Sequence, residues 1–155
     1  MKTKRMPNHF RERTHRRALQ GNRQVAGMNT EVDFHSEAFQ PILPEESQVN
    51  PECYGAELAW WLCRKFAESG VYTSYPNYED WGWFLEYVVG DNEYWLCCGN
   101  IIGEKNRWRI YLRPHAKSLF GRNKAPVEFT KPLLSTLSKV LAESAQISHI
   151  EWRES

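Results

Sequence analysis

The sequence predicts a single α+β domain, a two-layer sandwich in which two helices pack on a mostly antiparallel sheet. Between residues 81 and 113 the chain carries three runs rich in aromatic and β-branched residues, separated by short turn-forming segments. Such a series is typical of strands joined by hairpins. Apolar residues at helical spacing precede and follow these runs. Hairpin strands flanked by helices favour a two-layer arrangement with the order α-β-β-β-β-α-β.

The first helix is expected over residues 55–69. Its apolar residues recur three and four positions apart; they are Leu58, Ala59, Trp61, Leu62, Cys63 and Phe66. Gly70 follows as a helix-ending residue, because glycine adopts the left-handed conformation without strain. A short strand is expected next over residues 71–75, ended by Pro76 and Asn77.

A tryptophan-rich hairpin forms the centre of the predicted sheet. Its strands are expected over residues 81–89 and 94–102, with the Gly-Asp-Asn-Glu segment 90–93 as the connection. Because alternate residues of a strand share a face, one face of the first strand should point toward the core. The residues of that face are Trp81, Trp83, Leu85, Tyr87 and Val89.

The next strand, over residues 107–113, alternates apolar and polar side chains. Trp108, Ile110 and Leu112 point inward, and Arg107, Arg109, Tyr111 and Arg113 point outward. A second helix is expected over residues 131–143, with Thr130 as N-cap and Pro132 in its first turn. A last strand is expected over residues 147–152.

The charge of the chain divides it into an arm and a body. Of the 155 residues, 1–27 include eight basic residues and one acidic residue, which gives a net charge of +7. Residues 28–155 include twelve basic and eighteen acidic residues, which gives a net charge of −6. Residues 1–27 are too polar to build a core and are expected to form a basic, flexible extension. Residues 28–50 are interpreted as an extended polar lead-in, with Phe34 and Phe39 resting on the domain surface. The compact domain is placed at 51–155.

The composition argues for a cytoplasmic protein. No apolar run is long enough to cross a membrane, and the basic start is not followed by the apolar stretch of a secretion signal. The four cysteines form no Cys-x-x-Cys pair and are expected to be reduced thiols. The sequence contains no nucleotide-binding glycine loop, no nucleophile elbow and no metal-ligand spacing of His and Cys. Neither a cofactor nor a metal is therefore expected.

An acidic pair, Glu79 and Asp80, stands directly before Trp81 and Trp83. Two close carboxylates serve as acid and base when their environments separate their pKa values. The favoured interpretation is a solvated turn at the mouth of the core. A further alternative is partner binding, because carboxylates beside exposed aromatic rings combine charge with contact area.

The basic candidates are Arg107, Arg109 and Arg113 on one strand face, with Arg122 in the loop that follows. Arginines grouped in this way bind phosphate, nucleic acid or acidic proteins. The simpler interpretation is a solvated sheet face with carboxylate partners on neighbouring strands, a pairing that is worth about 0.2–1 kcal/mol.

These observations favour a small protein-interaction module without catalysis, either an adaptor or an antidote-type (immunity-like) protein. Its candidate binding surfaces are an acidic aromatic edge and an arginine face. The edge consists of Glu79, Asp80, Trp81 and Trp83, and the face consists of Arg107, Arg109, Arg113 and Arg122. One alternative is nucleic-acid binding through residues 1–27 and the arginine face. Another is a hydrolase that uses Glu79 or Asp80 in a tryptophan-lined cleft. The partner's identity and the oligomeric state do not follow from the sequence.

Overall fold

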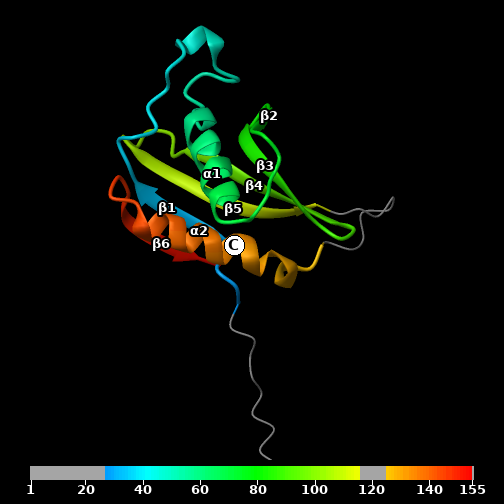
Figure 1. The fold of residues 1–155 in the computed structure, drawn as a ribbon. Coiled ribbons are helices and arrows are strands. Elements are labelled where there is room, and N and C mark those ends of the chain that lie inside the picture. Colours follow the sequence, from blue (N-terminus) through cyan, green and yellow to red (C-terminus); the bar gives the residue numbers. More distant parts are fainter. Residues whose placement is uncertain (1–26, 116–124, 155) are drawn as a thin grey trace, which may run out of the picture.

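A computed structural model describes residues 27–115 and 125–154. They contain one antiparallel, six-stranded sheet with the order β2-β3-β4-β5-β1-β6. Both α-helices lie on the same side of this sheet (Figure 1). The elements are β1 (Glu31–His35), α1 (Ala56–Glu68), β2 (Asn77–Glu79), β3 (Gly82–Val89), β4 (Asn92–Asn100), β5 (Arg107–His115), α2 (Lys131–Glu143) and β6 (Ser148–Arg153), with 3-10 turns at Glu45–Ser47 and Val127–Thr130. The predicted α+β class and the order α-β-β-β-β-α-β are confirmed, and one strand precedes that series.

Strand β1 is the main difference from the sequence expectation. It lies inside the sheet, paired with β5 on one side and β6 on the other. Phe34 and Phe39, expected on the surface of a lead-in, are 0% and 3% exposed. The segment is polar because its alternate residues, Glu31 and Asp33, face away from the helices and meet arginines there. The compact fold therefore begins before residue 31 rather than at 51.

The strand expected over residues 71–75 lies later in the chain, at Asn77–Glu79. Residues 71–75 hydrogen-bond to β3 at Glu86: the Ser74 N–H donates to the Glu86 carbonyl, and the Glu86 N–H donates to the Ser74 hydroxyl, both at 2.9 Å. Pro76 has no amide hydrogen to continue such pairing. The register is instead set by the turn at residues 80–81, which pairs Asn77–Glu79 with residues 82–84.

The hydrophobic core lies between the two helices and one face of the sheet. Helix α1 buries Leu58, Ala59, Leu62 and Phe66, and α2 buries Leu133, Leu134, Leu137, Val140 and Leu141. All of them except Val140 belong to one cluster with alternate residues of the strands, such as Phe34, Leu96 and Ile110. Trp61 and Cys63, which the helical spacing also places in the first stripe, are only partly buried against this cluster.

The opposite face of the sheet carries no helix of the described part of the chain (Figure 1). We call it the helix-free face. Some of its side chains are nevertheless buried, among them Asp33, Phe84 and Cys97. Burial here comes from neighbouring side chains on the same face, because long aromatic and arginine side chains extend across adjacent strands.

Two predicted features lie outside the described residues. They are the basic segment 1–26 and the loop 116–124, which includes Arg122. Within the described residues no helix has the length and apolar character needed to cross a membrane.

Candidate functional site

Trp81 and Trp83 lie on opposite faces of the sheet, not on one face as the alternation predicts. Strand β3 begins at Gly82, and Asp80 and Trp81 form the turn that joins β2 to β3. Gly82 has φ of +143°, a backbone conformation that other residues rarely adopt. This turn directs Trp81 onto the helix-free face, where its ring centroid lies 5.7 Å from that of Phe84. Trp83 faces the helix side instead and contacts Tyr78.

Glu79 is the last residue of β2 and Asp80 is the first residue of the turn that follows, and both are exposed. Neither carboxylate makes an ion pair or side-chain hydrogen bond with another described residue. The hydrolase hypothesis at this pair therefore rests on the sequence alone.

The two inner candidate arginines are neutralised by carboxylates of β1 and β6. Arg109 binds Asp33 through two hydrogen bonds, from Nε to Oδ1 at 2.7 Å and from Nη2 to Oδ2 at 2.9 Å. Arg153 donates to the same carboxylate. Arg107 pairs with Glu151 at 2.9 Å. We call this part the charged half, made of Glu31, Asp33, Arg107, Arg109, Glu151 and Arg153.

Asp33 is the centre of the charged half, and its side chain is only 3% exposed. Burial raises the pKa of its carboxyl, but hydrogen bonds and charge from Arg109, together with Arg153, outweigh that effect and hold the pKa below its ordinary value. The carboxylate is thus charged and fully engaged. The predicted basic surface is therefore, at these positions, a balanced structural ion-pair network.

Arg113 differs from the other arginines on this face. It is exposed, and its guanidinium carbon lies 5.7 Å from the ring centroid of Trp95. No carboxylate of the described residues pairs with it. A guanidinium over an indole is a favourable cation–π arrangement that leaves the N–H donors available to a partner.

Aromatic rings fill the rest of the helix-free face beside Arg113. Trp95 is the hub: its ring centroid lies 4.6 Å from Phe84, 4.7 Å from the stacked His115 and 6.3 Å from the stacked Trp81. The Trp95 indole N–H donates to Glu93 at 2.9 Å. We call Trp81, Phe84, Trp95 and His115 the aromatic cluster. A hollow of about 310 Å³ adjoins it, lined in part by Trp81, Ile102 and Tyr111.

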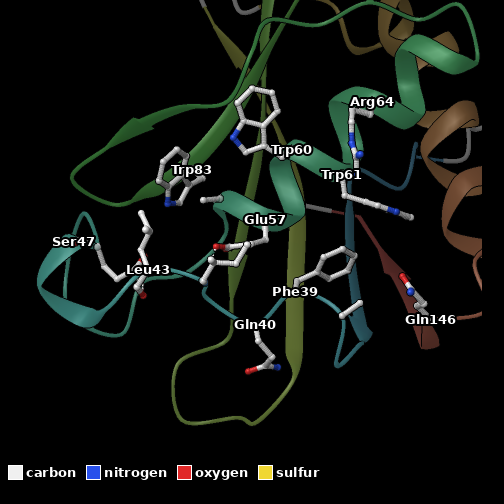
Figure 2. Close-up of a pocket in the computed structure, with 14 residues that line it drawn as sticks. Phe39, Gln40, Leu43, Ser47, Glu57, Trp60, Trp61, Arg64, Trp83 and Gln146 are labelled. Carbon is white, nitrogen blue, oxygen red and sulfur yellow. Dashed lines mark hydrogen bonds between the residues drawn. The ribbon is translucent and has the colours of Figure 1, made fainter.

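A larger pocket, of about 810 Å³, opens on the helix side of the molecule. It lies between α1 and the connection from β1 to α1, and Figure 2 shows its side chains. Three tryptophans line it, namely Trp60, Trp61 and Trp83. We call it the tryptophan pocket. The sequence reasoning missed it, although a visible signal existed: Trp60, on α1, falls outside the buried stripe and is 47% exposed.

Cys97 and Cys98 are buried and poorly suited to act as nucleophiles. Burial raises the pKa of the Cys97 thiol to about 11, and it raises that of Cys98 well above its ordinary value. A thiol with so high a pKa holds little of the reactive thiolate at neutral pH. No group of three or more His, Cys, Asp or Glu side chains in residues 27–115 and 125–154 is arranged to hold a metal ion.

Comparisons of the chain with protein-family models, curated proteins and solved structures gave no significant match. The function is therefore argued from the geometry of the helix-free face and the tryptophan pocket.

Proposed function

We propose that this protein is a small binding module that docks a partner protein on the aromatic cluster of its helix-free face. The observation that carries the proposal is Arg113. Arg107, Arg109 and Arg153 on the same face all bind carboxylates, whereas Arg113 lies over Trp95 without one.

The residue types of the cluster support a protein partner. Interface residues that dominate binding energy are enriched in tryptophan, tyrosine and arginine, because these side chains combine large apolar area with polar groups. Trp81 is 38% exposed although it stacks on the cluster, so part of its indole remains open to a partner. The stacking also holds the rings in place, which lowers the entropy lost on binding.

The charges on this part of the face indicate the partner's chemistry. Glu79 at the end of β2 and Asp80 in the turn directly precede Trp81, and Arg113 lies beside Trp95. A complementary surface presents a carboxylate to Arg113 and an apolar side chain to the hollow beside Trp81. Adaptor and antidote-type roles both agree with such a surface.

Nucleic-acid binding has less support from the described residues. Its predicted arginine face is largely engaged by carboxylates, since Arg109 binds Asp33 and Arg107 binds Glu151. Phosphate binding there would have to break these pairs. Binding through the basic residues 1–27 stays a prediction.

Affinity capture with charge-reversal variants tests the proposal. Three forms of the chain are used to capture partners from nuclease-treated native lysate. They are the wild type, the variant Arg113→Glu, and the control variant Lys139→Glu, whose substitution lies on the exposed side of α2. We expect a partner that wild type and Lys139→Glu retain and that Arg113→Glu retains at least about tenfold less, since a charge-assisted contact is worth about 1.5–3 kcal/mol.

Two outcomes would overturn the proposal. In one, the wild-type chain retains no partner at low or high salt. In the other, the retained partner binds Arg113→Glu as well as it binds the wild-type chain.

A further inference from the structure

The tryptophan pocket is built from segments that are far apart in the sequence. Its lining combines the connection after β1, the N-terminal half of α1, Trp83 of β3 and Gln146 before β6. Its volume of about 810 Å³ lies within the range of about 300–1,000 Å³ that is typical of small-molecule sites. It is on the opposite side of the sheet from the aromatic cluster, so the two surfaces can be tested separately.

Each tryptophan of the pocket is supported by another aromatic ring. Trp61 packs against Phe39 with ring centroids 5.3 Å apart. Trp83 contacts Tyr78 at 5.5 Å, and Trp60 contacts Tyr75 at 5.6 Å.

Phe39, behind Trp61, is itself held from the core side. Its ring centroid lies 5.8 Å from that of Trp108, whose indole N–H donates to the Ser36 carbonyl at 2.9 Å. The aromatic wall is therefore in place before any ligand enters, which favours the binding of a flat, rigid ring.

The connection from β1 to α1, which lines the pocket opposite α1, is also held in place by hydrogen bonds. The Ile42 N–H donates to Glu57 of α1 at 3.0 Å. Glu45 accepts hydrogen bonds from the Tyr54 hydroxyl and the Glu52 N–H, both at 2.6 Å. These contacts fix the course of the connection, on which Ile42 and Leu43 line the pocket with side chains that are 84% and 60% exposed.

Arg64 is the one cationic side chain among the described residues that line this pocket. It extends from α1, and no described residue makes an ion pair or side-chain hydrogen bond with it. Figure 2 shows its side chain on the Trp61 side of the pocket. Glu57, the one carboxylate of the lining, already accepts the Ile42 amide. The neighbouring Glu68 pairs with Lys65 at 2.9 Å.

Trp83 contributes a second donor without an acceptor. Its indole nitrogen is buried and has no hydrogen-bond partner among the described residues. Leaving a buried donor unsatisfied costs about 1–3 kcal/mol. In Figure 2 this nitrogen lies on the edge of the ring toward Leu43 and Glu57.

From this geometry we propose that the tryptophan pocket binds a small aromatic carboxylate. The ring of the ligand packs on the tryptophans, and its carboxylate pairs with Arg64. The indole N–H of Trp83 donates to a further acceptor on the ligand. Tryptophan faces also attract cations, but the charge of Arg64 opposes a cationic ligand at the same place.

Three probes that share a naphthalene ring and differ in charge test the charge requirement. They are 1-naphthylacetate, the neutral 1-naphthaleneethanol and the cationic 1-naphthylmethylammonium, titrated into the full chain and followed by the indole ¹H–¹⁵N signals. We expect 1-naphthylacetate to bind at least about tenfold more tightly than the alcohol. It should shift the signals of Trp60, Trp61 and Trp83 but not those of Trp81 and Trp95.

Variants of exposed arginines complete the test. Arg64→Gln should lower the affinity for 1-naphthylacetate to that for the alcohol, and the matched control Arg113→Gln on the helix-free face should leave it unchanged. Equal affinity for the three probes would overturn the proposal. So would an unchanged affinity in Arg64→Gln, or signal shifts confined to Trp81 and Trp95.

Discussion

The two faces of the sheet are filled by different physical means. The helix side is closed by apolar residues of α1 and α2 that pack on the strands. The helix-free face is closed by its own side chains, with ion pairs across β5, β1 and β6 and stacked rings across β3, β4 and β5. Alternation along the strands distributes residues between these faces.

The comparison shows that the location of a side chain on a face does not settle its role. On the helix-free face, Asp33 is as buried as a core residue, whereas Arg113 is exposed and unpaired within the described structure. On the helix side, Leu62 is fully buried, whereas Trp60 is half-exposed at a pocket. Each face therefore has a structural part and a part available for binding.

The largest expected effect is on the charged half. Asp33→Asn removes the negative charge that Arg109 and Arg153 share and replaces one acceptor oxygen with an amide donor. It should lower the free energy of unfolding by about 3 kcal/mol. The matched control, Glu151→Gln, breaks an exposed pair and should cost less than about 1 kcal/mol. Urea denaturation measures both. An equal decrease in the free energy of unfolding in the two variants would show that the burial of Asp33 does not strengthen its contribution to stability.

A smaller effect is expected where α1 meets β4. A Cβ on Gly55 would lie 2.5 Å from the Cys98 carbonyl oxygen, so Gly55→Ala must move the start of α1. Such crowding typically costs 1–3 kcal/mol, and we expect about 2 kcal/mol. The indole signals of Trp60 and Trp61 should shift while those of Trp81 and Trp95 stay. Gly70→Ala, which has no atom within 4 Å of the added Cβ but a φ of +77°, is the control and should cost about 1 kcal/mol.

The pH dependence of stability separates the two faces further. Because the pKa of Asp33 is lowered in the folded state, its contribution is present above the ordinary carboxyl range and is lost as the pH falls through the lowered value. The free energy of unfolding should therefore decrease below a pH of about 4. Asp33→Asn should flatten this decrease, and Arg64→Gln on the helix side should not.

The smallest effect is expected at the connection beside the pocket. Hydrogen bonds from the Tyr54 hydroxyl and the Glu52 amide lower the pKa of Glu45. These hydrogen bonds to the Glu45 carboxylate therefore persist at neutral pH and are lost only as the pH falls through that lowered pKa. Glu45→Gln should speed hydrogen exchange at the Glu52 amide while the exchange of β4 amides stays slow. Faster exchange in β4 as well would show that the whole fold, not the connection, had been loosened.

Several elements were predictable because their signals are local. The spacing of Leu58, Leu62 and Phe66 identified α1, and alternation identified the inward face of β5. The same rule failed at Trp81, because the turn at residues 80–81 interrupts the alternation. It could not identify the tryptophan pocket, since Trp60 and Trp83 meet only after α1 has packed on β3.

The sequence by itself determined both helices, the β3–β5 hairpins and the inward faces of β3 and β5, because periodicity is a property of neighbouring residues. Only the tertiary structure decided where β1 belongs and what its polar residues do. In the sequence, the acidic residues Glu31 and Asp33 are typical of a loop. In the structure they lie in a strand, because β5 and β6 place Arg109 and Arg153 beside them as ion-pair partners. The same assembly leaves Arg113 and Arg64 unpaired within the described residues, because pairing depends on which distant strands and helices become neighbours.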